Sequence, residues 1–202
     1  MDPSPTIDPT WERAAAELMP VVRRALEAAV TRGRSSPTGD LPRTPPFDQP
    51  CGIFVTLKRA EQLRGCIGLP YPVQPMVEAA WQAAQQSALE DPRFPPVTAP
   101  ELEEMDVTVS ILTPHQPLAD ISEWRAGVDG AVLDLKGRRA LYLPEVAVET
   151  GWDGETFFTH LALKAGLNPR AWRDPEVRLW SFRSVTATGP VRGEADPPAG
   201  AG

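Results

Sequence analysis

The chain of 202 residues is poor in the side chains that bind metals or form disulfides, with only 2 cysteines and 2 histidines. Two cysteines, Cys51 and Cys66, are too few for a disulfide framework, and we expect both to be free thiols in a reducing compartment. His115 and His160 lie far apart, and neither a Cys-x-x-Cys nor a His-x-x-x-His spacing occurs. We therefore predict no metal site and no cofactor.

An excess of positive charge and long apolar runs are also missing. A formal net charge of −7 opposes binding to nucleic-acid phosphates and to anionic membrane surfaces. No apolar run approaches the about 20 residues that span a bilayer. The first residues, Met1–Pro5, have neither the basic nor the apolar region of a signal peptide. We predict a cytoplasmic protein with no nucleic-acid partner and no membrane partner.

Hydrophobic spacing predicts helices interleaved with strands. An apolar stripe of helical period runs from Trp11 to Ala29, and Pro20 inside it predicts a kink or a restart. A second long helix is expected to open at Pro75 and to end at Asp91, because the residue before a proline avoids the helical region. Short helices are predicted from Pro144 to Gly151 and over residues 153–165.

Runs rich in β-branched and aromatic residues predict strands, and Lys136-Gly137 predicts a hairpin turn. The expected strands are Gly52–Leu57, Leu63–Ile67, Met105–Leu112, Ala131–Leu135, Arg139–Leu143 and Val177–Val185. Together these elements predict an α+β fold with an antiparallel sheet flanked by helices. We expect residues 1–10 to be a mobile leader, residues 11–187 a single domain, either undivided or with a large and a small lobe, and residues 188–202 a disordered tail.

The densest chemistry lies in the stretch Leu63–Gly68. Residues i and i+2 of a strand share a face, so Arg64 would project beside Cys66 and stabilise a nucleophilic thiolate or hold an anionic group. Gly65 and Gly68 flank the thiol with backbone N–H groups that can hold an anion. The alternative is that Cys66 is a buried packing residue, as free cysteines commonly are. Neither histidine has a spacing that marks it as a general base.

Two proline-flanked loops carry charge. Asp91-Pro92-Arg93-Phe94 would place Arg93 and Phe94 at the rim of a cleft, or would simply form a surface ion pair. Glu145 follows Pro144 in the second of these loops. Cys51 and Cys66 flank a short hairpin, and the two thiols would be neighbours if their strands paired in that register.

These stretches resemble the AMMECR domain family, named for the human AMME-syndrome chromosomal region. The resemblance runs through a series of motifs in order, from about Trp11 to Phe182: Gly52–Leu57, Leu63–Gly68, Asp91–Pro96, Val109–Pro114, Leu143–Val146, Gly151–Asp153 and Lys164–Leu167. Family members often carry a second cysteine where this chain has Ala162, which argues against a two-cysteine mechanism here.

The resemblance implies an α+β fold in which a smaller lobe forms a cleft near the Arg-Gly-Cys-Ile-Gly motif. Prokaryotic members resemble partners of a radical-SAM protein and of a Memo-like protein, itself similar to extradiol dioxygenases, which implies work on a small molecule. We hypothesise an enzyme or enzyme component in which Cys66 and Arg64 are catalytic. The substrate would be held by Gly65, Ile67, Gly68, Asp91, Arg93, Phe94 and Glu145. The alternative is a non-catalytic binding or adaptor module that docks to a protein partner through the same cleft.

Overall fold

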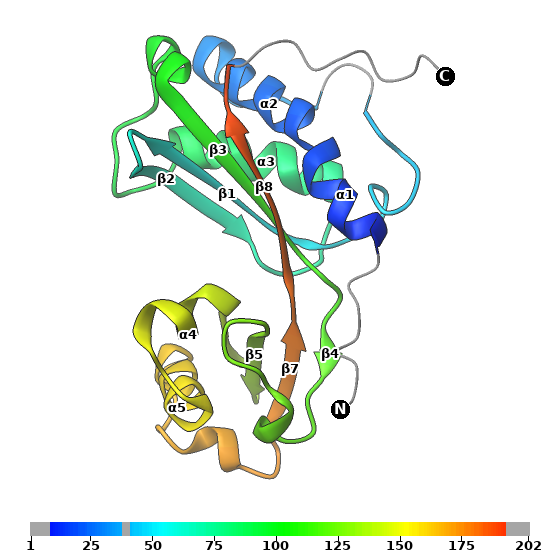
Figure 1. The fold of residues 1–202 in the computed structure, drawn as a ribbon, viewed down its shortest axis with the longest axis vertical. Helices are drawn as coiled ribbons and strands as arrows, with labels where there is room; N and C mark the ends of the chain where they lie inside the picture. The colour runs from blue at the N-terminus through cyan, green and yellow to red at the C-terminus, as the bar shows by residue number, and fades with distance from the viewer. Residues whose placement is uncertain (1–8, 38–40, 193–202) are drawn as a thin grey trace. The chain divides into compact units, whose positions relative to one another are not determined.

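The structure is a computed structural model that describes residues 9–37 and 41–192, and the chain divides into two compact units. The first unit combines the residues up to Ile111 with those from Val185 onward, and the second comprises Leu112–Ser184. Each unit has its own four-stranded sheet and its own apolar core (Figure 1). Helices flank antiparallel sheets, so the predicted α+β class is confirmed. Within the described ranges, no helix has the length and apolar character needed to cross a membrane.

The long helical pattern at the start of the chain forms two helices rather than one. Helix α1 (Pro9–Glu17) and helix α2 (Met19–Arg32) meet at Leu18, and Pro20 lies in the first turn of α2. A proline is tolerated there because its missing N–H would have no partner within the helix. The predicted restart at Pro20 is therefore confirmed. Helix α3 (Met76–Leu89) packs on strands of the first sheet, and α2 packs on α3.

The first sheet has the strand order β2-β1-β3-β8. Its strands are β1 (Gly52–Arg59), β2 (Gln62–Leu69), β3 (Met105–Leu112) and β8 (Ser184–Pro190). Ala60 and Glu61 join β1 to β2 with φ values of 47° and 63°, the left-handed conformation that matches the twist of a two-residue hairpin. Because this turn is so tight, both strands extend beyond their predicted ends.

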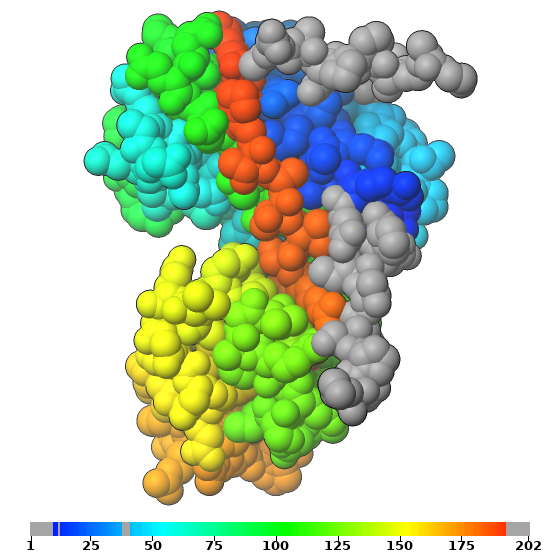
Figure 2. All heavy atoms as spheres, viewed as in Figure 1, coloured from blue at the N-terminus to red at the C-terminus, as the bar shows by residue number. Residues whose placement is uncertain are grey.

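The last predicted strand, Val177–Val185, is wrong as a single element. The chain forms β7 (Arg178–Phe182) in the second sheet and, after Arg183, enters β8 at the edge of the first sheet. Figure 2 shows β8 at the surface of the first unit. Residues 188–190 of the expected tail therefore belong to a strand, and Pro9 and Thr10 of the expected leader begin α1. Val191 follows this strand, is buried, and donates its N–H to the Met105 carbonyl at 2.8 Å. Residues 1–8 and 193–202 lie outside the described residues.

The second unit packs helices α4 (Pro144–Thr150) and α5 (Gly154–Lys164) on a sheet of order β4-β7-β5-β6. The other strands of this sheet are β4 (Gln116–Pro117), β5 (Gly130–Leu135) and β6 (Arg138–Tyr142). Short 3₁₀ turns complete the fold: η1 (Ala99–Glu104) in the first unit, η2 (Ile121–Glu123) and η3 (Ala171–Arg173) in the second. The core is aromatic, with the ring of Trp124 stacked on Phe157 at a centroid distance of 4.4 Å.

The predicted turn between β5 and β6 is confirmed, and a buried aspartate secures it. Lys136 and Gly137 have φ values of 54° and 83°. The Asp134 carboxylate is 2% exposed, accepts the Gly137 N–H at 3.0 Å, and binds the Arg139 guanidinium at 2.6 Å. The hydrogen bond from Arg139 holds the pKa of Asp134 below its usual range. The hairpin therefore depends on a charged carboxylate.

We predict that Asp134→Asn lowers the free energy of unfolding at pH 7 by about 3 kcal/mol, because it leaves the Arg139 guanidinium without its buried counterion. The folded pKa of Asp134 lies below the unfolded value of about 3.9. The difference in free energy of unfolding between wild type and variant is therefore fully present above that pH. It becomes smaller as the pH falls through the folded pKa. Urea denaturation at pH 7 and pH 3 measures this. Glu176→Gln, which removes an exposed partner of Lys136, is the control and should change neither curve.

Candidate functional site

The Cys66 thiol lies on the face of the first sheet that α3 does not cover. Cys66 belongs to the edge strand β2 and pairs with Thr56 of β1. A Cβ atom on the preceding residue, Gly65, would come within 2.2 Å of the Ser87 carbonyl oxygen of α3. Since successive strand residues point to opposite faces, Cys66 points away from the helix. Its half-buried sulfur lies 3.2 Å from Thr56 Oγ1.

An ion pair from the loop after α3 holds the backbone of Cys66. The Cys66 N–H donates to Asp91 Oδ2 at 2.8 Å, and the Cys66 carbonyl accepts from Arg93 Nη2 at 3.2 Å. Arg93 also binds Asp91 through Nε at 2.9 Å and through Nη2 at 2.7 Å. Asp91 and Arg93 thus supply the two hydrogen bonds that a neighbouring strand would otherwise provide. The predicted site residues Cys66, Asp91 and Arg93 are brought together.

The charges of this arrangement are fixed over the physiological range. The Arg93 guanidinium, helped by the Cys66 N–H, holds the pKa of the buried Asp91 carboxyl far below its usual range. The pKa of Arg93 is raised, chiefly by its hydrogen bond to Asp91 and also by the Cys66 thiol. The cation bound to Cys66 is therefore Arg93, through the Cys66 carbonyl oxygen.

Arg64 has a different set of contacts from those expected. Its Nε donates to Glu101 Oε1 at 2.8 Å and its Nη1 to the Pro95 carbonyl at 2.9 Å. The hairpin register shifts between Leu57 and Lys58, opposite Arg64, so regular alternation does not hold there. The guanidinium lowers the pKa of Glu101 to about 2. Arg64 therefore holds the loop that leads into η1. Its described hydrogen bonds are to this loop and to η1, and none is to Cys66.

Ser87 is a site residue that the sequence reasoning missed. Its side chain is fully enclosed in α3, and its Oγ accepts the Ile67 N–H at 2.9 Å and lies 2.7 Å from the Val55 carbonyl oxygen. The Ser87 hydroxyl therefore bonds both the Ile67 N–H of β2 and the Val55 carbonyl of β1, two groups that face each other across paired strands. The backbone on both sides of Cys66 is thus held by α3 and the loop that follows it. The sequence offers one indication of this role: Ser87 is a polar residue among the apolar positions of the predicted helix.

The remaining predicted residues surround this centre or lie in the second unit. A Cβ on Gly68 would meet the Phe54 ring at 2.2 Å, so this ring covers Gly68 on the same face as Cys66. The guanidinium carbon of Arg93 lies 5.5 Å from the centre of the Phe94 ring. Glu145 belongs to α4 of the second unit. Both histidines of the chain also lie in the second unit. His160 stacks on Trp152 with a centroid distance of 4.0 Å.

The two thiols are not neighbours, which corrects the suggestion drawn from the sequence. Thr56 is the residue opposite Cys66, and Cys51 precedes it by five residues. At the usual rise per strand residue this places Cys51 about 16 Å along the chain from the residue opposite Cys66, well beyond the limit of about 7 Å between the Cα atoms of a disulfide. Cys51 is also buried, and burial raises the pKa of its thiol to about 12.

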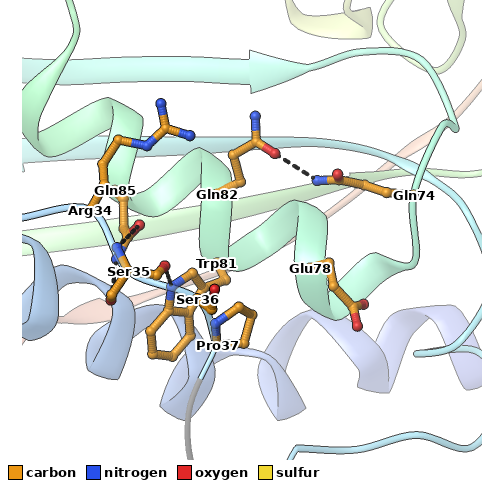
Figure 3. A pocket seen from close by; sticks show the side chains of 9 residues that line it. All are labelled: Arg34, Ser35, Ser36, Pro37, Gln74, Glu78, Trp81, Gln82 and Gln85. Atoms are coloured by element: carbon orange, nitrogen blue, oxygen red, sulfur yellow. Dashed lines mark hydrogen bonds between the residues drawn. The ribbon is translucent and has the colours of Figure 1, made fainter.

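A polar pocket of about 420 Å³ lies elsewhere in the first unit, between α3 and the chain that follows α2 (Figure 3). The indole N–H of Trp81 donates to the Ser35 carbonyl at 2.8 Å, and the Ser35 N–H donates to Gln85 at 3.1 Å. Gln74 and Gln82 bind each other at 3.0 Å. The two bonds of Ser35 hold the connecting chain on α3. Across residues 9–37 and 41–192, no group of three or more His, Cys, Asp or Glu side chains could hold a metal ion.

Comparisons with known proteins agree with this architecture. The AMMECR1 family profile matches residues 19–187. A protein of Methanothermobacter thermautotrophicus is 45% identical over 175 residues, covering 83% of this chain and 90% of that protein. A protein of Thermococcus gammatolerans is 41% identical over 191 residues, covering 87% and 92%.

The crystal structure of an uncharacterised protein from Pyrococcus horikoshii superposes with a TM-score of 0.75 at 36% identity, covering 87% of this chain and 91% of that one. The chain therefore belongs to the AMMECR1 family, which confirms the resemblance drawn from its motifs.

We predict that Gly65→Ala lowers the free energy of unfolding by about 2 kcal/mol, because its methyl group would be forced against the α3 backbone at Ser87. Gly154→Ala is the matched control, since a Cβ there makes only ordinary contacts, the nearest at 3.6 Å from Trp124. Thermal and urea unfolding of the two variants make the comparison. Equal stability of the two would show that α3 does not approach β2 as closely as described.

Proposed function

We propose that the chain is an enzyme, or a component of one, that acts on a small molecule through the Cys66 thiol. The proposal rests on one observation: a half-buried thiol on a residue whose backbone N–H and C=O are both held by the Asp91–Arg93 pair, with Arg93 Nη2 3.2 Å from the Cys66 carbonyl oxygen. A guanidinium stabilises the thiolate, which is the nucleophilic form of cysteine. A backbone fixed on both sides keeps that sulfur in one position.

Each surrounding residue has a role in this proposal. Arg93 stabilises the thiolate, while Asp91 fixes both Arg93 and the Cys66 backbone. Gly65 and Gly68 let α3 and the Phe54 ring approach β2 closely. Phe94 packs beside the Arg93 guanidinium and would contact a bound substrate. The described hydrogen bonds of Cys66 are with Thr56, Asp91 and Arg93, and in this proposal the thiol proton passes to solvent.

The family resemblance extends the proposal to partners and place. We propose a cytoplasmic protein that works with a Memo-like protein and a radical-SAM protein on a shared small molecule. The net charge of −7 supports this against a nucleic-acid or membrane partner.

A second candidate function is a binding or adaptor module that docks to a partner through the same residues. The observation that favours it is the Arg93 side chain, which is 54% exposed although its guanidinium is held by Asp91. An exposed, oriented arginine is a common anchor of protein interfaces. In this case the affinity for a Memo-like protein, measured by calorimetry, would depend on Arg93 and would survive Cys66→Ala.

We predict that iodoacetamide alkylates Cys66 in the folded protein, because its thiol is half-buried and its backbone carbonyl is bound by the Arg93 guanidinium. The alkylation rate of each cysteine at pH 7.5 is followed by mass spectrometry. Cys51 is the internal comparison, and we expect no reaction there in the folded protein because burial raises its pKa to about 12.

Arg93→Gln should slow the alkylation of Cys66, because it removes the cation that stabilises the thiolate. Arg59→Gln should leave the alkylation rate unchanged, because it removes the same charge from an arginine that pairs with Glu104 instead. A Cys66 that stays unreactive until the protein unfolds would identify a packing residue and end the proposal for a catalytic thiol. The adaptor function would then be pursued with Arg93→Gln in the binding experiment.

A further inference from the structure

A second surface, in the other unit, has the properties of a protein-docking site and involves none of the residues around Cys66. We call it the α4 surface. It encloses a pocket of about 350 Å³ and is formed by Gly127, Val128, Glu145, Val148, Glu149 and Ser184. Figure 2 shows the atoms of α4 at the outside of the second unit.

The α4 surface concentrates exposed apolar side chains. In the described ranges the exposed large hydrophobic residues are Leu63, Val73, Val128, Val148 and Leu163. Val148 is 70% exposed and Val128 is 43% exposed, and both line this one pocket. A Cβ on Gly127 would lie 2.8 Å from Val148 Cγ2, so the loop before β5 and helix α4 are in contact. The two valines thus form one patch, with no role in the core of the unit.

Glu145 lies in the first turn of α4, where a carboxylate is favourable, but its spacing from Glu149 and the position of Glu149 are unfavourable for the helix by itself. Glu145 and Glu149 are four residues apart and share a face, where like charges repel. Glu149 lies in the last turn, at the negative end of the helix dipole, where no basic side chain compensates it. For neither carboxylate does any part of the chain that the structure describes provide an ion pair or a hydrogen bond. A cation from outside would relieve both effects.

The pocket also contains a polar group that has no partner. The Ser184 Oγ is enclosed by protein atoms but makes no hydrogen bond with any described residue. A ligand group that entered between Val148 and this hydroxyl would satisfy it. Apolar contact, negative charge and a free hydroxyl are therefore adjacent on one surface.

We propose that the α4 surface binds a helical segment of a partner protein in which two cationic side chains flank an aliphatic one. Glu145 and Glu149 are separated by one helical turn, about 6 Å along the axis, which matches lysines or arginines at positions i and i+4 of the partner helix. The aliphatic side chain packs on Val128 and Val148. Charge favours a basic partner over a second copy of this chain, whose net charge is −7. The proposal goes beyond the function assigned to Cys66 and does not depend on it.

The test uses a fluorescent helical peptide built from the repeat Lys-Ala-Ala-Leu-Lys, and a counterpart in which glutamate replaces each lysine. Binding to the full chain is measured by fluorescence anisotropy. The contacted carboxylates are then mapped by carbodiimide coupling, in which a lysine amine and a carboxyl group form an amide and the carbodiimide leaves as a urea. We expect the lysine peptide alone to bind, and its cross-links to fall on Glu145 and Glu149.

Two variants of the α4 surface should each weaken binding at least fivefold: Val148→Ser, and the double change Glu145→Gln with Glu149→Gln. Glu123→Gln removes an exposed charge elsewhere in the second unit and should leave the affinity unchanged. Since Val148 is largely exposed, thermal unfolding should show that Val148→Ser keeps the fold.

Three results would overturn the proposal. The first is no binding of the lysine peptide, or cross-links spread over exposed acidic residues such as Glu123. The second is full affinity in Val148→Ser. The third is cross-linking of α4 between two copies of the chain, with a dimer in sedimentation, which would make the occupant a second copy. Loss of Cys66 reactivity would leave each of these results unchanged, so the two proposals fail separately.

Discussion

The bond between Asp91 and Arg93 is the interaction on which the candidate site depends. β2 is an edge strand, and its backbone at Cys66 would otherwise face outward without a partner. A buried carboxylate is stable there only because a guanidinium and the Cys66 N–H both bind it. Pro92, between the two charged residues, limits the conformations of the loop. The position of the thiol thus follows from the need to compensate one buried charge.

The same device recurs elsewhere in the molecule. Asp91, Asp129 and Asp134 are buried, and each binds an arginine and a backbone N–H close to it in sequence. Each of the three fixes a loop or turn: the loop after α3, the segment before β5, and the turn between β5 and β6. Burial makes each carboxylate effective, because charge-assisted hydrogen bonds are stronger when water is excluded. Local ion pairs of this kind therefore fix the conformation of the loops, whereas apolar packing stabilises the two cores.

Local signals in the sequence predicted local structure well. Pro20 marked the restart of the helix, and Lys136-Gly137 marked a turn that needs positive φ. Two predictions failed because contacts between residues distant in sequence determine the structure there. The expected place of Arg64 beside Cys66 assumed unbroken alternation, but the register shift opposite Arg64 breaks it. β8 was missed because Gly189 and Pro190 suggest a loop, whereas pairing in the first sheet makes the segment a strand. The bond between Ser87 and Ile67 joins residues 20 positions apart and leaves no periodic signature.

The separation of the two cysteines determines how the protein responds to oxidants. Cys51 is enclosed in the core of the first unit, about five strand residues along from the position opposite Cys66. A sulfenic acid formed on Cys66 has no resolving thiol within the same chain. It can return to the reduced state only through a thiol brought by another molecule, by way of a mixed disulfide. The redox state of this surface is therefore linked to the thiol pool of its surroundings rather than to an internal switch.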